Sequence, residues 1–203
     1  QHLYESLSLG DTIEHFMHFH HTYIRVNATL WQQYGKGKLS KEALRDNRFK
    51  ETLAHHGIND YALAQKMSDG YIEMSPKQTA LFPGAIETLT ELKRQEYRMH
   101  IITNGFHEVQ QVKLATSGLS SFFDVVLSSE SIGFTKPHRE IFQEAQRLTN
   151  CQPQHAIMIG DDFKADIIGA LNANWTAIHF DPEIKFKKER NVPRVRSLNE
   201  LPE

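Results

Sequence analysis

The stretch AIMIGDDFKADIIGA, residues 156–170, places an apolar run directly before a cluster of acids. Residues 156–159 are all apolar, and Asp161, Asp162 and Asp166 follow closely. Carboxylates at this spacing repel one another, so a cation, a cationic side chain or solvent has to relieve the repulsion. The apolar run predicts a buried strand, and the acids predict polar chemistry where that strand ends.

The chain around this stretch alternates between short β-rich runs and helical patterns. The β-rich runs span 98–103, 123–129, 156–161 and 176–180. The helical patterns span 85–95, 106–116, 138–149 and 165–172. Strands separated by helices favour right-handed crossovers and a parallel sheet covered on both faces. Ligands of such sheets bind beyond the carboxyl ends of the strands, where we therefore look for a site.

Before residue 80 the pattern is helical throughout. A broad stripe at helical spacing predicts a first helix and comprises Ile13, Phe16, Met17, His20, Ile24, Asn27, Trp31 and Tyr34. Ser40 can cap a second helix to about His55, and a third is expected over Asp60–Met74. We expect residues 1–79 to form a small helical domain and residues 80–203 an α/β core.

Composition limits the classes of protein to consider. The 203 residues are 39% hydrophobic and carry a net charge of −2, which gives no electrostatic case for a nucleic-acid or membrane partner. Cys151 is the single cysteine, so we expect a cytoplasmic protein without an intramolecular disulfide. The histidine-rich run at 14–23 could bind a metal if helical, but a polar helix face is the favoured interpretation.

Candidate site residues follow two of the predicted strands. Thr103, Asn104 and Gly105 could seat an anion at a helix start, or could form an ordinary capped turn. Lys136 precedes Pro137 at a helix start, where a cation is disfavoured unless it serves an anion or acids. A solvated surface lysine is the alternative.

The acids after the third strand suit a divalent cation. Asp161 and Asp166 offer the hard carboxylate oxygens that Mg²⁺ uses together with water and phosphate. Capping by Asp161 or Asp162 would explain one acid and leave Asp166 unexplained. The three strand ends together predict Mg²⁺-assisted chemistry on a phosphate.

The order of these motifs resembles the haloacid dehalogenase superfamily of phosphotransferases. IITNG (101–105), KP in GFTKPHREIF (133–142) and IGDDFKADIIGA (159–170) match its second, third and fourth motifs. More narrowly, IITNGFHEVQQVKLATSGL, LWQQYGKGKLS and Arg48–Phe49 resemble its bacterial pyrimidine 5′-nucleotidase branch. The resemblance implies a Rossmann-like parallel core with a helical cap, the first 79 residues being similar to that cap.

The resemblance also implies roles for these residues. Thr103 would hydrogen-bond the phosphoryl group, with Asn104 and the Gly105 N–H shaping its seat. Lys136 would offset the charge of the phosphate and the carboxylates. Asp161 would bind Mg²⁺ directly, and Asp166 would act through water or through Lys136. Asp162 matches no required position.

The family's first motif, Asp-x-Asp, is missing from these 203 residues. Its first Asp is the nucleophile and its second the general acid–base. Either the motif has been lost, or it lies on roughly 20–30 residues upstream of Gln1, the size of one short βα connection. The second explanation is favoured, because the resemblance implies that the missing strand lies between those ending at Thr103 and Gly160, and removing it would leave two unpaired internal edges.

The expected function is Mg²⁺-dependent hydrolysis of pyrimidine nucleoside monophosphates through an aspartyl phosphate, by a monomer or homodimer. Asn27, Trp31 and Arg48 are the candidate cap residues near the leaving group; Trp31 in the core and Arg48 in a surface ion pair are the alternative. A sugar phosphatase, a 2-haloacid dehalogenase and an inactive binding or regulatory protein remain as other functions.

Overall fold

The chain divides into two compact units. The computed structural model describes residues 1–13, 15–184 and 192–201. Its units are Gln1–Lys77 and Gln78–Glu203, a division close to the change of pattern near residue 80. No described helix is long and apolar enough to cross a membrane.

The first unit is helical. Its elements are α1 (His2–Ser6), η1 (Leu9–Asp11), α2 (Phe16–Gly35), α3 (Lys41–Ala54), α4 (Tyr61–Met74) and η2 (Ser75–Lys77). The Ser40 side chain accepts a hydrogen bond from the Ala43 N–H at 3.1 Å. The Asp60 side chain accepts one from the Leu63 N–H at 2.9 Å. Both predicted starts are thus confirmed as N-caps, which satisfy backbone donors that a helix leaves unpaired.

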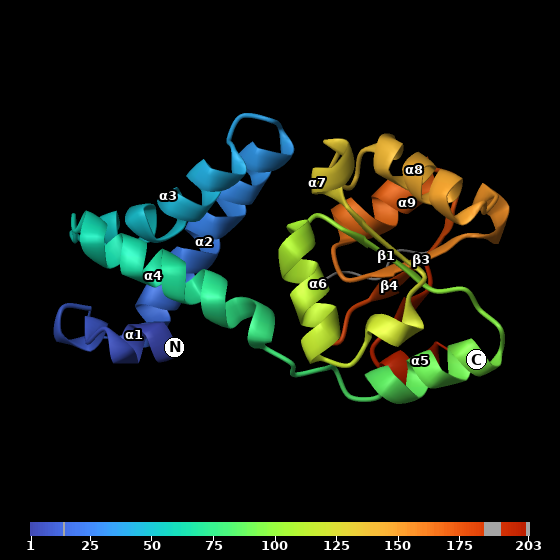
Figure 1. Ribbon diagram of the computed structural model, residues 1–203, viewed down its shortest axis with the longest axis horizontal. Helices are drawn as coiled ribbons and strands as arrows, with labels where there is room; N and C mark the ends of the chain where they lie inside the picture. Colours follow the sequence, from blue (N-terminus) through green and yellow to red (C-terminus); the bar gives the residue numbers. More distant parts are fainter. Residues whose placement is uncertain (14, 185–191, 202–203) are drawn as a thin grey trace. The chain divides into compact units, whose positions relative to one another are not determined.

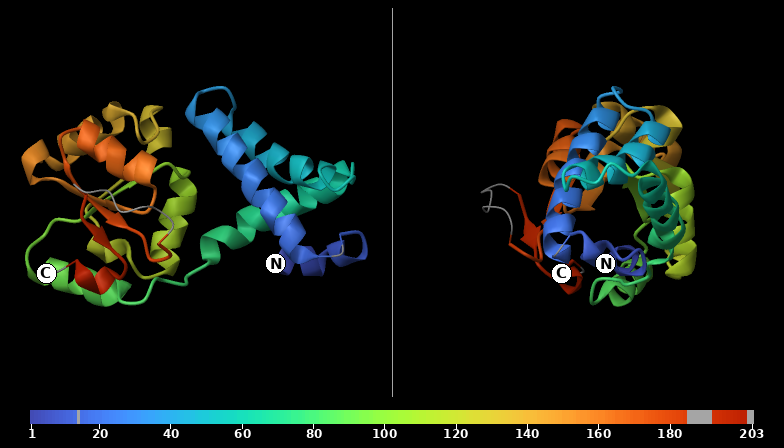
Figure 2. Two further views of the ribbon diagram at one scale, coloured as in Figure 1. Left: turned by 180° about the vertical axis from the view of Figure 1, so that it is seen from behind. Right: turned by 90° about the vertical axis from the view of Figure 1, so that its left-hand side faces the viewer.

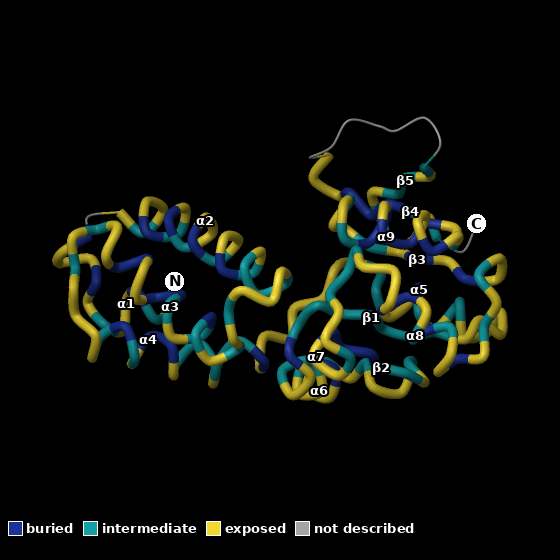
Figure 3. Tube along the Cα trace, turned by 90° about the horizontal axis from the view of Figure 1, so that it is seen from above, coloured by how far each residue is buried: buried dark blue, intermediate teal, exposed yellow. Residues whose placement is uncertain are grey.

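The buried face of α2 differs from the predicted stripe. The helix buries Phe19, Thr22, Val26 and Leu30, whereas Met17 and Ile24 of the predicted stripe are exposed. Figure 3 shows buried and exposed stretches alternating along α2. The prediction was wrong because α2 is apolar on several sides, and packing against α3 and α4 selects a face that includes a threonine. The core of this unit comprises Tyr4, Leu9, Ile13, Phe19, Phe49, Leu53, Ala64 and Met67.

The second unit has the predicted α/β order. Its strands are β1 (His100–Thr103), β2 (Val125–Ser128), β3 (Ile157–Gly160), β4 (Thr176–Phe180) and β5 (Arg194–Val195). Its longer helices are α5 (Ala85–Arg94), α6 (His107–Thr116) and α8 (Arg139–Thr149). Its short helical segments are α7 (Ser129–Ile132), a π-helix η5 (Phe163–Ile168), α9 (Gly169–Asn172), η3 (Ser120–Phe122), η4 (Pro153–His155) and η6 (Leu198–Glu200).

The strands form two parallel sheets. β1 pairs with β2, and β3 pairs with β4, which pairs with β5. Helices α8 and α9 lie on one side of these strands and α5 on the other, in Figure 1 and from behind in Figure 2. Within the described residues no pairing joins β1 to β3, so each has one unpaired edge. The single continuous sheet of the α/β pattern is therefore interrupted at the place where a strand was expected to be missing.

The two faces of β3 differ in burial. Met158 packs in the core with Ile141, Phe142 and Ile167. Its neighbours Ile157 and Ile159 are 49% and 37% exposed. Alternate side chains of a strand point to opposite faces, so one face of β3 is covered and the other is not. The exposed Ile157 and Ile159 side chains thus lie on a strand that also has an unpaired edge within the described residues.

Candidate active site

Lys136 and Asp166 form a buried ion pair. The Lys136 Nζ lies 2.6 Å from Asp166 Oδ1, with the two side chains 10% and 6% exposed. The same Nζ donates to the Ile102 carbonyl of β1 at 2.8 Å. Lys136 therefore links β1 to the segment after β3, and it is not a solvated surface lysine.

Asn104 holds the backbone of Lys136 from two sides. Its Nδ2 donates to the Lys136 carbonyl at 3.0 Å, and its Oδ1 accepts from the Lys136 N–H at 2.7 Å. The Ser129 Oγ in turn donates to the Asn104 carbonyl at 3.3 Å. The Asn104 side chain thus faces the loop that carries Lys136.

Thr103 and Gly105 form a tight turn at the end of β1. The Gly105 N–H donates to Thr103 Oγ1 at 3.0 Å, which leaves the hydroxyl proton to donate elsewhere. A Cβ at position 105 would overlap the Gln110 side chain, so glycine allows the backbone of the turn to lie close to Gln110. Thr103, Asn104 and Lys136 lie together at the carboxyl end of β1, as the sequence predicted.

Asp166 is fixed from three directions. Besides Lys136, its carboxylate accepts a hydrogen bond from the Asp162 N–H at 3.1 Å. A Cβ on Gly160 would overlap the Asp166 side chain, so glycine at the end of β3 lets this acid pack against the strand. Asp166 is buried, and its contacts support the role through Lys136 rather than direct binding of a cation.

The side chains of Asp161 and Asp162 make different contacts. The Asp162 side chain caps the π-helix by accepting from the Lys164 and Ala165 N–H groups at 3.0 and 2.8 Å. Asp161 is exposed, and its carboxylate has no protein partner among the described residues. Its carbonyl lies 3.3 Å from the His179 Nε2, which helps to fix the turn. The contact with His179 was not anticipated from the sequence, because this residue lies in another predicted strand, 18 positions away.

The acid set suits a cation that keeps most of its ligands from solvent and substrate. The described residues contain no group of three or more His, Cys, Asp or Glu placed to hold a metal ion. Mg²⁺ needs only one or two protein carboxylates when phosphate and water complete its shell. The exposed Asp161 carboxylate fits this requirement. Rings of His15 and His18 lie 5.5 Å apart in the histidine-rich run, of which position 14 lies outside the described residues.

The three cap candidates lie in the helical unit. Arg48 is 5% exposed, its guanidinium lies 4.6 Å from the centre of the Tyr71 ring, and it has no carboxylate partner among the described residues. The alternative of a surface ion pair is therefore wrong. Trp31 is half-buried, with its ring 5.6 Å from that of Tyr34. Asn27 Oδ1 is buried and finds no hydrogen-bond partner in the described part of the chain.

Tyr23 lies in the aromatic cluster around Arg48, which also includes Phe49 and Tyr71. Burial raises the pKa of the Tyr23 hydroxyl, Tyr71 adds to the rise, and the Arg48 guanidinium opposes it. The Tyr23 ring stacks on Phe49 at 5.5 Å. Arg48 is thus a buried cation held by aromatic rings and a phenol, an arrangement that stabilises a charge without neutralising it.

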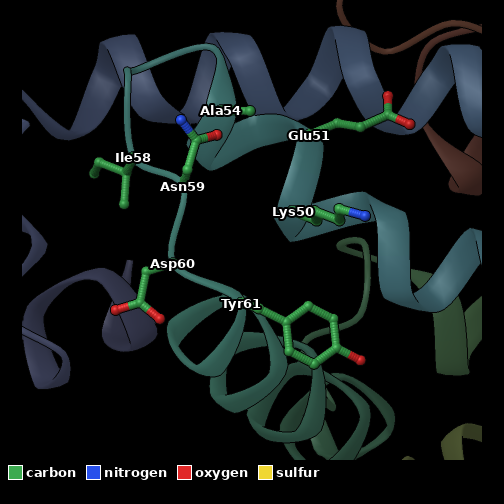
Figure 4. Close-up of a pocket in the computed structure, with 7 residues that line it drawn as sticks. All are labelled: Lys50, Glu51, Ala54, Ile58, Asn59, Asp60 and Tyr61. Atoms are coloured by element: carbon green, nitrogen blue, oxygen red, sulfur yellow. The ribbon is translucent and has the colours of Figure 1, made fainter.

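A separate hollow of about 200 Å³ lies in the helical unit, between the end of α3 and the start of α4. Figure 4 shows its lining, which includes Lys50, Glu51, Asp60 and Tyr61. The Asp60 side chain already caps α4. The hollow includes none of the predicted site residues.

Comparison with known proteins identifies the family. A family model described as haloacid dehalogenase-like hydrolase matches residues 17–180. Pyrimidine 5′-nucleotidase YjjG of Escherichia coli is 29% identical over 99% of this chain and 87% of its own. Glyceraldehyde 3-phosphate phosphatase of Methanothermobacter thermautotrophicus is 42% identical over 56% of this chain, and this match spans half of its own length. A structure of the putative HAD-hydrolase YfnB of Bacillus subtilis, described as bound to magnesium, has a TM-score of 0.82 at 27% identity, covering 97% of this chain and 88% of that one.

Proposed function

Since this chain belongs to the haloacid dehalogenase-like hydrolases, we propose that it is part of a Mg²⁺-dependent phosphomonoester hydrolase acting on pyrimidine nucleoside 5′-monophosphates. One observation carries the proposal above the others. The buried Lys136–Asp166 pair holds an ammonium group at the Ile102 carbonyl, one residue before Thr103, and at Asp166, five residues after the exposed Asp161. A fixed cation, a hydroxyl donor and an available carboxylate are suitable equipment for a phosphate with Mg²⁺.

In this proposal the residues share the work of holding the phosphoryl group. The Thr103 hydroxyl donates to one of its oxygens. The Lys136 ammonium donates to another and stabilises the charge that develops as the ester bond breaks. Asp161 would hold Mg²⁺, which when bound offsets the negative charge of the phosphate oxygens. Asp166 holds the Lys136 ammonium in place through the 2.6 Å contact.

The nucleophile has to come from a segment other than those described. A carboxylate oxygen attacks phosphorus, the bond to the nucleoside 5′-oxygen breaks, and a general acid, the second Asp of the family's first motif, donates a proton to that oxygen as the nucleoside leaves. Water then hydrolyses the acyl phosphate and releases inorganic phosphate. The unpaired edges of β1 and β3 support this proposal, because a parallel strand between them would satisfy both edges and end beside Thr103 and Gly160.

Nucleotides and sugar phosphates are the two substrate classes to separate. The match to a nucleotidase extends over nearly the whole chain, including the helical unit, and supports the first class. The match to glyceraldehyde 3-phosphate phosphatase supports the second as the alternative, although it covers only about half of this chain. A dehalogenase needs no Mg²⁺, so the exposed Asp161 carboxylate favours phosphate chemistry.

Phosphate release by the full-length protein tests the proposal. We expect turnover of UMP and dUMP that requires Mg²⁺ and stops when a chelator is added. Good rates on sugar phosphates with none on nucleotides would overturn the substrate class. Halide release from 2-chloropropionate without phosphate release would overturn the reaction. An intact mass near the 23.4 kDa of this chain, in an active preparation, would contradict an additional strand.

A further inference from the structure

Asn104 stands where an anion-binding residue is expected, directly after β1. Its side chain is turned instead toward the loop before α8. The carboxamide makes two hydrogen bonds to one residue, through Nδ2 to the Lys136 carbonyl and through Oδ1 from the Lys136 N–H. Two bonds to the same peptide backbone fix both the place and the tilt of that residue.

The two bonds matter because of what Lys136 does with its side chain. An ammonium group has three N–H donors. One donates to the Ile102 carbonyl at 2.8 Å, and one contacts Asp166 Oδ1 at 2.6 Å. At least one N–H therefore remains for a ligand, and the two contacts restrict where the ammonium group lies.

The aliphatic stem of a lysine is flexible, so contacts at the ammonium group alone do not fix the position of the Lys136 backbone. The Ile102 and Asp166 groups hold the tip of the side chain, whereas Asn104 holds the backbone from which it starts. With both ends fixed, the stem has little freedom left. The arrangement resembles the support that precise functional sites require around the residue that touches substrate.

We propose that Asn104 is a positioning residue, which acts by fixing the Lys136 backbone so that the remaining ammonium N–H points to the substrate phosphate. Its effect on turnover rests on the proposed function, but its effect on Lys136 does not. Direct hydrogen bonding of the Asn104 side chain to phosphate is the competing role. The orientation of both its polar groups toward Lys136 disfavours that role.

Chemical labelling of lysines tests the structural part without any substrate. The protein is treated with an acetylating reagent, and the rate at each lysine is measured by mass spectrometry of peptides. Asn104→Ala should raise the rate at Lys136 by about tenfold or more, because two hydrogen bonds that hold the closed arrangement are lost. Labelling of the exposed Lys38, in the helical unit, should not change.

Ser129→Ala is the matched control. It removes the hydrogen bond to the Asn104 carbonyl and keeps both bonds to Lys136. It should leave Lys136 labelling within about twofold of the unsubstituted protein, since one weak bond has little net effect. Asn104→Leu, of similar size but without polar groups, should behave like Asn104→Ala. Unchanged labelling in both Asn104 variants would overturn the proposal, and so would unfolding of both, because a positioning residue does not hold the fold together.

A double-mutant cycle tests the catalytic part. Asn104→Ala should lower kcat/KM, yet should add little to the loss caused by Lys136→Ala, because the two residues act as a unit. Additive losses would assign Asn104 a separate contact with phosphate. Faster labelling without any phosphatase activity would uphold the positioning and reject the proposed function, so the two failures are distinguishable.

Discussion

The Lys136 ammonium and the Asp166 carboxylate approach to 2.6 Å in a part of the α/β unit that solvent scarcely reaches. The two side chains connect two strands: the Lys136 ammonium donates a hydrogen bond to the Ile102 carbonyl of β1, and Asp166 lies in the π-helix that follows β3. Burying one of these charges alone would cost several kcal/mol, so each makes the other tolerable. The three acids are accommodated in three ways: Asp166 by the Lys136 ammonium, Asp162 by backbone N–H groups of the π-helix, and Asp161 by solvent.

Lys136→Ala should abolish turnover and lower the free energy of unfolding. It leaves Asp166 buried without its cation, which should cost about 3–5 kcal/mol in the free energy of unfolding. Urea unfolding measures this loss, and Lys38→Ala at an exposed site is the control. The loss should be smaller in the double variant Lys136→Met with Asp166→Leu, which buries no charge. Wild-type turnover in Lys136→Ala would reject the site.

Gly160→Ala should disturb the position of Asp166. The new Cβ would overlap the Asp166 side chain, and relieving such an overlap typically costs about 1–3 kcal/mol. Gly10→Ala is the control, because its Cβ would find no atom of the surroundings closer than 3.8 Å. The midpoint temperature of thermal unfolding and kcat should both fall in Gly160→Ala, and both should stay near wild type in Gly10→Ala. Equal behaviour of the two would contradict the packing of Asp166 against β3.

Arg48→Met tests the role of the buried cation in the helical unit. Methionine keeps an apolar stem at this position and removes the cost of burying a charge that has no carboxylate partner among the described residues. If Arg48 contacts the leaving group, KM for nucleotides should rise while the free energy of unfolding is maintained. Arg25→Met on the exposed side of α2 should change neither. A large loss of stability with an unchanged KM would assign Arg48 to the fold alone.

The stability of the protein should depend on His100 below neutral pH. Burial lowers the pKa of the His100 imidazole; the Asp124 carboxylate opposes this shift and Arg98 adds to it. The unfolded chain takes up a proton near its ordinary pKa of about 6.5, whereas the folded chain resists it, so stability falls as pH drops below that value.

The comparison of His100→Val with the unsubstituted protein measures this effect. The free energy of unfolding, followed from pH 7.5 to 5.5 (about one pH unit either side of the ordinary pKa), should fall less steeply in the variant. His155→Gln, at an exposed position, should keep the original slope. A slope unchanged by His100→Val would show that other groups govern the acid side.

Local sequence patterns predicted much of the fold correctly. The four longer strands lie within the β-rich runs, Ser40 caps α3 as expected, and α4 begins next to the expected start at Asp60. Such features depend on neighbouring residues, so a short stretch carries the information. The grouping of Thr103, Asn104 and Lys136 was also predictable, because carboxyl ends of parallel strands meet at one edge.

Other features depended on residues far apart in the chain. The buried face of α2 was chosen by α3 and α4, and Thr22 on it gave no apolar signal. The predicted helix over 165–172 proved to be a π-helix followed by α9, with Asp162 as its cap. The two-residue strand β5 has too little pattern to be recognised before its pairing with β4 is seen.

The sequence by itself determined the order of strands and helices and which chemical groups stand at the strand ends, because periodicity and motif spacing are local properties. Only the tertiary structure decided how those groups are used. In the folded chain Lys136 pairs with Asp166, and the Asn104 side chain hydrogen-bonds the Lys136 backbone. Asp162 caps the π-helix, and Asp161 is exposed. Those choices depend on distances between strands, which packing sets and no single stretch of sequence contains.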